Sequence, residues 1–153
     1  MPPSGYFVDA SLLVLLVVGS LDRDLIAKHR RLRTYSSDDY EILIKLLDPV
    51  ERVLVTPNTL TETSNLLAQH PEPERSRFFE RLRFIIGEAR EVVVASVIAS
   101  DNSAFERLGL TDAALLEAIT PDTPLVTVDL DLYLKANAGG QEVALNFTHF
   151  RNL

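Results

Sequence analysis

Short runs rich in β-branched residues alternate along the chain with segments long enough to form helices. The strand-like runs cover residues 6–8, 52–55, 92–95, 125–128 and 142–145. Such alternation is typical of an α/β fold, in which a parallel sheet carries helices on both faces. The chain has 153 residues, a length that suits one hydrophobic core. We therefore expect a single α/β domain over residues 1–153.

Polar residues mark where the intervening helices begin. Thr56 precedes Pro57, and this pair predicts a helix start with Thr56 as the cap. Thr111 is the candidate cap of a later helix that runs through Ile119. Residues 19–39 are polar and lack a regular period, so we expect a mobile, irregular insertion there, near the functional site.

The composition is that of a soluble globular protein, with 46% hydrophobic and 24% charged residues. Cysteine is absent, which excludes disulfides, a thiolate zinc site and a cysteine nucleophile. The most apolar run, residues 12–18, is far too short to span a bilayer. Residues 1–5 lack the basic start of a secretory signal. We expect a cytoplasmic protein that does not associate with a membrane.

Four acidic residues lie where the predicted apolar segments begin or end: Asp9, Glu62, Asp112 and Asp129. A carboxylate in apolar surroundings is costly unless it is paired or holds a metal ion. Four converging carboxylates without matching bases would repel one another, and a Mg²⁺ or Mn²⁺ ion bound by their oxygens would remove that repulsion. The pattern therefore favours a metal-dependent phosphodiester hydrolase.

The first two of these acids also have simpler interpretations. Asp9 follows a predicted strand, where ligands bind in open parallel sheets, but it could instead cap the next helix. Ser11 is the better candidate for that cap. Glu62 lies about one turn inside its predicted helix and shares a face with Asn58 and Asn65. That face could simply be solvated.

The two later acids are more informative. Asp112 heads an apolar stripe on its helix and so faces the interior, although it would also interact favourably with the helix N-terminus. Asp129 ends a predicted strand, and either it or Asp131 could cap the segment that follows. Thr127 projects to the same face of that strand as Asp129. Its hydroxyl is therefore placed to orient a water molecule or the neighbouring carboxylate.

In their order and context, these residues resemble the PIN-domain ribonuclease family over nearly the whole chain. The resemblance rests on Val8-Asp9-Ala10-Ser11, on Glu62 after Thr56-Pro57, on Leu110-Thr111-Asp112-Ala113-Ala114 and on Val126-Thr127-Val128-Asp129. It implies a three-layer α/β/α fold with a parallel five-stranded sheet, and Mg²⁺- or Mn²⁺-dependent hydrolysis of RNA. Many small PIN proteins are toxins of toxin–antitoxin pairs, so it also implies a homodimer and an antitoxin partner.

The resemblance also implies roles for single residues. Asp9, Asp112 and Asp129 would hold one metal ion, Glu62 would complete the cluster, and Asp131 is an additional candidate ligand. Ser11 and Thr127 would not bind the ion themselves but would orient its ligands by hydrogen bonds. By analogy with the family, the products would carry a 5′-phosphate and a 3′-hydroxyl.

The net charge of −7 argues against broad, non-specific binding of nucleic acid. An RNA substrate would therefore need local basic patches. The strongest basic run contains Lys28, Arg30, Arg31 and Arg33, although such a run is also typical of a solvated surface. A second basic set lies on one predicted helix and comprises Arg75, Arg77, Arg81 and Arg83.

Three other functions remain as alternatives to an RNA hydrolase. The first is a catalytically inactive PIN-like module that binds RNA or a protein partner. A receiver-like phosphotransfer domain is disfavoured because the first strand carries only Asp9 and no lysine closely follows the fourth strand. A structure-specific DNA nuclease is disfavoured because the chain is short for the extra helices that such enzymes use.

Overall fold

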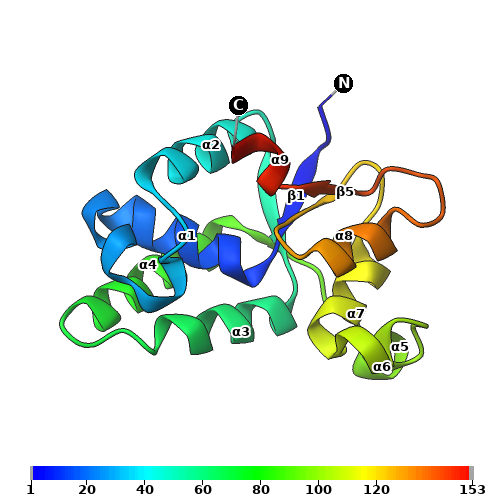
Figure 1. The fold of residues 1–153 in the computed structure, drawn as a ribbon. Coiled ribbons are helices and arrows are strands. Elements are labelled where there is room, and N and C mark those ends of the chain that lie inside the picture. The colour runs from blue at the N-terminus through cyan, green and yellow to red at the C-terminus, as the bar shows by residue number, and fades with distance from the viewer. Residues whose placement is uncertain (1, 152–153) are drawn as a thin grey trace.

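A five-stranded parallel sheet forms the centre of the molecule, as expected from the sequence. The computed structural model describes residues 2–151. All neighbouring strands pair in parallel, in the order β3-β2-β1-β4-β5. The strands are β1 (Gly5–Val8), β2 (Arg52–Val55), β3 (Arg90–Glu91), β4 (Leu125–Thr127) and β5 (Ala144–Asn146). The predicted three-layer α/β/α fold is confirmed (Figure 1).

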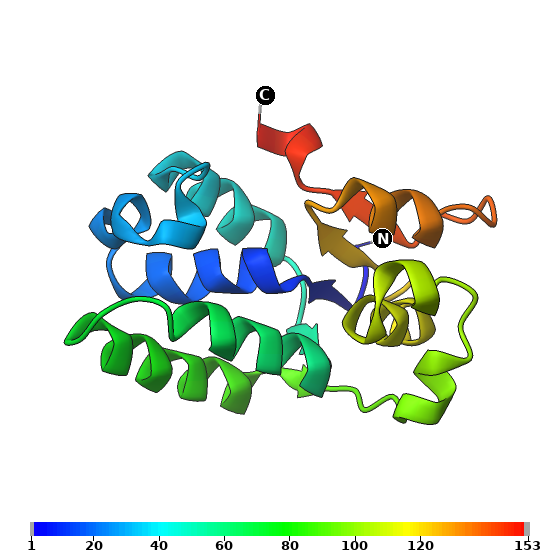
Figure 2. The same ribbon diagram turned by 60° about the horizontal axis from the view of Figure 1, so that its bottom comes forward.

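Two groups of helices cover the two faces of the sheet (Figure 2). The helices of the first group are α1 (Ala10–Leu21), α2 (Ser37–Leu47), α3 (Pro57–Leu67) and α4 (Glu74–Glu88). Those of the second are α5 (Ser96–Ser100), α6 (Phe105–Leu108), α7 (Leu110–Ala118) and α8 (Leu130–Ala136). The short 3₁₀ helices η1 (Arg23–Lys28) and η2 (Arg30–Leu32) follow α1, and α9 (Thr148–Arg151) packs against α2.

The side chains of β1 alternate between two hydrophobic clusters. Tyr6 and Val8 pack with α1, whereas Phe7 packs with Leu115 of α7 and Leu132 of α8. This alternation follows from the two-residue period of a strand that is covered on both faces. Helix α1 is buried on almost every side because it contacts α2, α3 and α4 as well as the sheet. Among residues 2–151, no helix is both long and apolar enough to cross a membrane.

The third strand is shorter than predicted and lies earlier in the chain. Only Arg90 and Glu91 belong to β3, and residues 92–95 form no strand. The N–H of Val92 still donates to the carbonyl of Val55, the last residue of β2. Beyond that point this edge of the sheet has no neighbouring backbone, so the chain leaves it and Val93 is 73% exposed. A β-branched run favours a strand, but a strand also needs a partner.

The expectation of an irregular insertion at residues 19–39 is wrong. Helix α1 continues to Leu21, and the two 3₁₀ helices then fold back over it, burying Leu25, Ile26 and Leu32. The His29 ring is also buried and stacks on the His70 ring, with 5.2 Å between the ring centroids. Turns this short do not repeat long enough to produce a detectable period in the sequence.

One predicted helix cap is confirmed and another is wrong. Thr56 caps α3, because its Oγ1 accepts a hydrogen bond of 3.1 Å from the N–H of Thr59. Thr111 does not cap α7, which begins at Leu110 after Gly109 and ends at Ala118. Gly109 has a φ of 89°, a conformation that glycine adopts without strain. The backbone therefore turns into the helix before Thr111 is reached.

Candidate active site

The four acids that the sequence singled out face one cavity at the carboxyl edge of the sheet. Asp9 directly follows β1 and Asp129 lies two residues beyond β4, and these strands are neighbours. Asp112 lies in the first turn of α7, and Glu62 lies in α3. All four line a cavity of about 270 Å³, which we call the carboxylate cavity. Its other polar lining residues are Ser11, Thr111 and Thr127.

Three hydrogen bonds hold the Asp9 carboxylate. Oδ1 accepts from the N–H of Leu12 at 3.0 Å, and this bond makes Asp9, rather than Ser11, the cap of α1. Oδ2 accepts from the Thr127 hydroxyl at 2.5 Å and from the N–H of Val128 at 2.9 Å. Asp9 therefore both caps a helix and lines the cavity, and the two interpretations of this residue are compatible.

Thr127 connects the two acids at the strand ends. Its Oγ1 accepts a hydrogen bond of 3.0 Å from the N–H of Asp129 and donates its own proton to Asp9. The hydroxyl is fully buried, so no water competes for it. The hydroxyl thus orients the Asp9 carboxylate, whereas the sequence led us to expect a water molecule or the carboxylate of Asp129, whose backbone N–H it contacts instead.

Asp129 also has two roles. Its Oδ1 accepts from the N–H of Leu132 at 3.0 Å, so Asp129 caps α8 and the alternative cap, Asp131, does not. The second oxygen of Asp129 accepts no hydrogen bond from any residue that the structure describes. Asp131 is exposed in the first turn of α8 and does not line the carboxylate cavity. The structure thus places the additional candidate ligand outside the cavity.

The electrostatics of the cavity disfavour negative charge on Asp9 and Asp112. Burial, followed by the charges of Asp129, Glu62 and Asp9, raises the pKa of Asp112 to about 6. Burial also raises the pKa of Asp9, although the hydrogen bonds from Thr127, Leu12 and Val128 oppose this rise. No lysine or arginine lines the cavity. The acids therefore repel one another without a compensating cation among the residues that line the cavity.

The donor chemistry of the cavity suits a hard divalent cation, because every charged group in its wall is a carboxylate. Asp112 accepts no hydrogen bond within residues 2–151, so its oxygens are available to an ion. In their present conformations, however, no three Asp, Glu or His side chains of this part of the chain are grouped closely enough to hold one ion together. Glu62 has an exposed side chain that can change rotamer.

The predicted basic run lies outside the cavity. Lys28, Arg30, Arg31 and Arg33 are all exposed on or beside the two 3₁₀ helices. The Nε of Arg31 donates a hydrogen bond of 2.8 Å to the side chain of Gln69, just beyond the end of α3. Glu62 is seven residues earlier, which corresponds to roughly 10 Å along a helix axis. The run therefore lies about two turns of α3 away from the carboxylate cavity.

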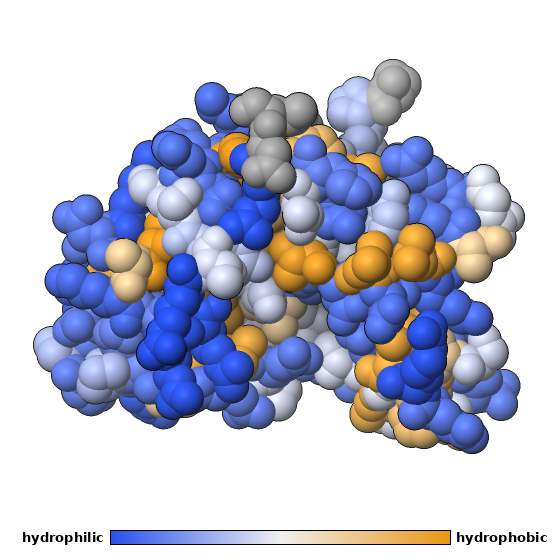
Figure 3. Space-filling view, in the orientation of Figure 1, coloured by the Kyte–Doolittle hydropathy of each residue, from blue (hydrophilic) through white to orange (hydrophobic). Residues whose placement is uncertain are grey.

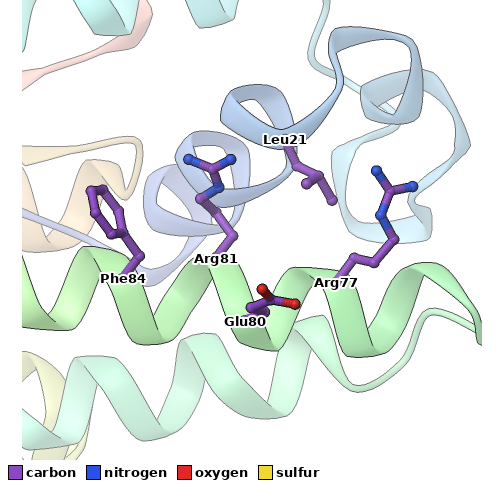
Figure 4. Close-up of a pocket in the computed structure, with 5 residues that line it drawn as sticks. All are labelled: Leu21, Arg77, Glu80, Arg81 and Phe84. Carbon is purple, nitrogen blue, oxygen red and sulfur yellow. The ribbon is translucent and has the colours of Figure 1, made fainter.

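Two arginines of α4 line a different cavity. Arg77 and Arg81 extend toward the end of α1 and, with Leu21, Glu80 and Phe84, line a space of about 360 Å³ (Figure 4). Asp9 precedes α1 and Leu21 is its last residue, so the length of this helix, about 18 Å, separates the two cavities. Arg75 instead packs its guanidinium over the Phe79 ring.

Two groups in the site were not assigned to it from the sequence. Thr111 lines the carboxylate cavity, and its position next to Asp112 was the one signal that could have indicated this. The N–H of Val128 donates a hydrogen bond to Asp9. Every residue except proline has this backbone donor, so the identity of residue 128 does not indicate the bond. No protein-family model matches the chain, and no curated protein matches it either.

The raised pKa of Asp112 predicts that its charge destabilises the metal-free fold above pH 6. An acid whose folded pKa exceeds its unfolded value of 3.8 lowers stability once it ionises, and that loss is relieved as the pH falls from 6 to 3.8. Asp112→Asn should therefore raise the free energy of unfolding at pH 7.5 by about 1 kcal/mol, after allowance for solvent screening. Urea unfolding in EDTA at pH 7.5 and pH 5 measures this.

The matched control is Asp131→Asn, which removes an exposed carboxylate outside the cavity and should change stability by less than about 0.5 kcal/mol. A loss of stability at pH 7.5 in Asp112→Asn would contradict this account of the cavity.

Proposed function

We propose that the protein is a cytoplasmic Mg²⁺- or Mn²⁺-dependent ribonuclease of the PIN type. The observation that carries the proposal is the carboxylate cavity, in which acids from four separate elements meet at the carboxyl edge of a parallel sheet. That edge is where open α/β sheets bind their ligands. The ordered resemblance of the chain to PIN ribonucleases supports the same activity.

In this proposal, Asp112 and Asp129 bind the ion with the oxygens that no other group occupies. Asp9 adds its charge from a position fixed by Thr127 and Val128, and Glu62 completes the set by a change of rotamer. A bound divalent cation would activate a water molecule and neutralise charge on the scissile phosphate. Without it, four carboxylates would repel the phosphate, so the proposal requires the reaction to depend on a metal ion.

The contribution of Thr127 is to keep Asp9 in place. Its hydroxyl accepts a hydrogen bond from the backbone N–H of Asp129 and donates one to the Asp9 carboxylate. These two bonds fix the Asp9 carboxylate relative to the Asp129 backbone. Ser11 lines the same cavity and is half-buried, so its hydroxyl is placed to bind water beside the acids. Phosphates further along the RNA would contact the exposed basic run that contains Arg30 and Arg31.

Cleavage of a labelled structured RNA tests the activity. With Mn²⁺ or Mg²⁺ the wild type should cut, and EDTA should abolish cutting. Asp9→Asn and Asp112→Asn should each reduce the rate at least about 100-fold, because loss of a partner behind a metal ligand alone costs about 10–100-fold. Asp131→Asn serves as the control and should cut at nearly the wild-type rate. Cutting in EDTA, or full activity of Asp9→Asn, would refute the proposed chemistry.

The second candidate function is a catalytically inactive PIN-like module that binds RNA or a protein. One observation favours it: both Asp9 oxygens are already occupied by three donors, and no three acids of residues 2–151 are grouped for one ion. For this module, the same assay would give no cleavage by the folded protein with any metal. Mn²⁺ would also leave its melting temperature unchanged.

We further propose that the protein is a homodimer in which the partner subunit covers α8 beside the site. As in many small PIN toxins, an antitoxin protein would then hold the dimer inactive. Apolar side chains gather on the surface over α8 (Figure 3). Leu130 and Leu134, 57% and 55% exposed, lie one turn apart on this helix, immediately after Asp129. Such neighbouring exposed leucines are typical of a protein interface.

Light scattering after size exclusion tests the dimer. The wild type should elute as a dimer and Leu130→Glu/Leu134→Glu as a monomer with an unchanged circular dichroism spectrum. The control is Val97→Glu, which alters an apolar residue on α5 that is even more exposed, at 76%. A wild-type monomer, or an intact dimer in the double variant, would remove this surface from the dimer.

A further inference from the structure

A second cavity adjoins the carboxylate cavity along α3. It has a volume of about 360 Å³, and its wall consists of Pro57, Asn58, Thr61, Glu62, Asn65 and Thr111. Glu62 and Thr111 also line the carboxylate cavity, so the two spaces share a wall. We call this second space the amide cavity. A group bound in it lies directly beside whatever the carboxylates bind.

The amide cavity presents neutral hydrogen-bonding groups. Asn58, Glu62 and Asn65 stand at positions i, i+4 and i+7 of α3 and so share one face of the helix. Neither the Asn58 nor the Asn65 side chain forms a hydrogen bond with another residue in the described part of the chain. Each amide offers two donors and one acceptor oxygen. Both are therefore free to contact a ligand.

The charges around the amide cavity exclude a phosphate as its occupant. No lysine or arginine lines it, and Glu62 contributes a negative charge to its wall. Glu62 would repel an anion, whereas a neutral group with donors and acceptors on its edge would pair with the amides. The Pro57 ring adds an apolar surface against which a flat group can pack.

We infer that the amide cavity holds one unpaired nucleobase of the RNA strand whose phosphate faces the carboxylates, and that Asn58 and Asn65 read this base. The inference rests on the proposed function. Protein amides pair in bidentate fashion with adenine edges, and sequence-specific RNA recognition relies on hydrogen bonds to the edges of unpaired bases. The cavity should therefore favour adenine.

Positive charge lies beyond the amide cavity, past the C-terminal end of α3. Four residues after Asn65, the side chain of Gln69, just beyond the end of α3, accepts a hydrogen bond from Arg31. This arginine supplies positive charge where the strand leaves the amide cavity. The cavity thus takes the neutral base, and the exposed basic run takes the phosphates that follow it.

Titration of the protein with the tetranucleotides of A, C, G and U tests the inference, with Ca²⁺ present in place of Mg²⁺ or Mn²⁺. Nuclear magnetic resonance of the ¹⁵N-labelled side-chain amides reports contact at Asn58 and Asn65 directly. The A tetranucleotide should shift both amide signals and bind tightest.

Asn58→Ala and Asn65→Ala should each weaken binding of the A tetranucleotide about tenfold. Each should change the affinity for the U tetranucleotide by less than about twofold. Gln141→Ala removes an exposed amide elsewhere and is the matched control.

Cleavage of a randomised RNA pool, mapped by sequencing, separates this inference from the proposed function. Cutting with a base preference that the Asn58 and Asn65 variants lose would support both. Cutting with a preference that the variants leave unchanged would overturn the inference alone. No cutting, but amide-dependent binding of the A tetranucleotide, would overturn the nuclease and retain the base site. Tetranucleotides that leave both amide signals unmoved would overturn the base site, as would binding that shifts them equally for all four bases.

Discussion

The Asp9 carboxylate connects the parts of the site, and its three hydrogen bonds are the constraint on which the rest depends. Through them, the end of β1 is joined to the start of α1 and to the chain that leaves β4. Thr127 extends the connection to the backbone of Asp129. Two neighbouring strands and two helix starts thus share one partly buried polar network, which positions Asp9 and Asp129 before any ligand binds.

The opposing constraint is electrostatic. The fold brings Asp9 and Asp129 to one cavity with Asp112 and Glu62, and no lysine or arginine lines the wall of that cavity. Like charges that lie close together in partly buried surroundings are costly when no opposite charge pairs with them, and the raised pKa of Asp112 expresses that cost. A fold rarely retains such an arrangement for stability alone. A cation that pairs with these acids would turn the cost into binding energy, which is the physical basis of the proposed nuclease.

Much of this arrangement follows from the sequence because it depends on local patterns. β-branched runs predict the sheet, and acids at strand ends meet because parallel strands share one carboxyl edge. Other features depend on neighbours distant in the sequence. The end of β3 after Glu91 reflects a missing partner strand, and the start of α7 reflects the positive φ of Gly109. In the sequence, Asn58 and Asn65 resemble a solvated helix face, and only the fold shows that Thr111 of α7 lines a cavity together with them.

Anomalous diffraction from crystals grown with Mn²⁺ tests the central claim, that the four acids form a metal site, most directly. The account predicts one strong anomalous peak inside the carboxylate cavity, within coordination distance of Asp112 and Asp129, and no such peak in Asp112→Asn crystals. Manganese bound elsewhere with the carboxylate cavity free of anomalous signal would contradict it. The acids would then be helix caps and surface charges that happen to face one another.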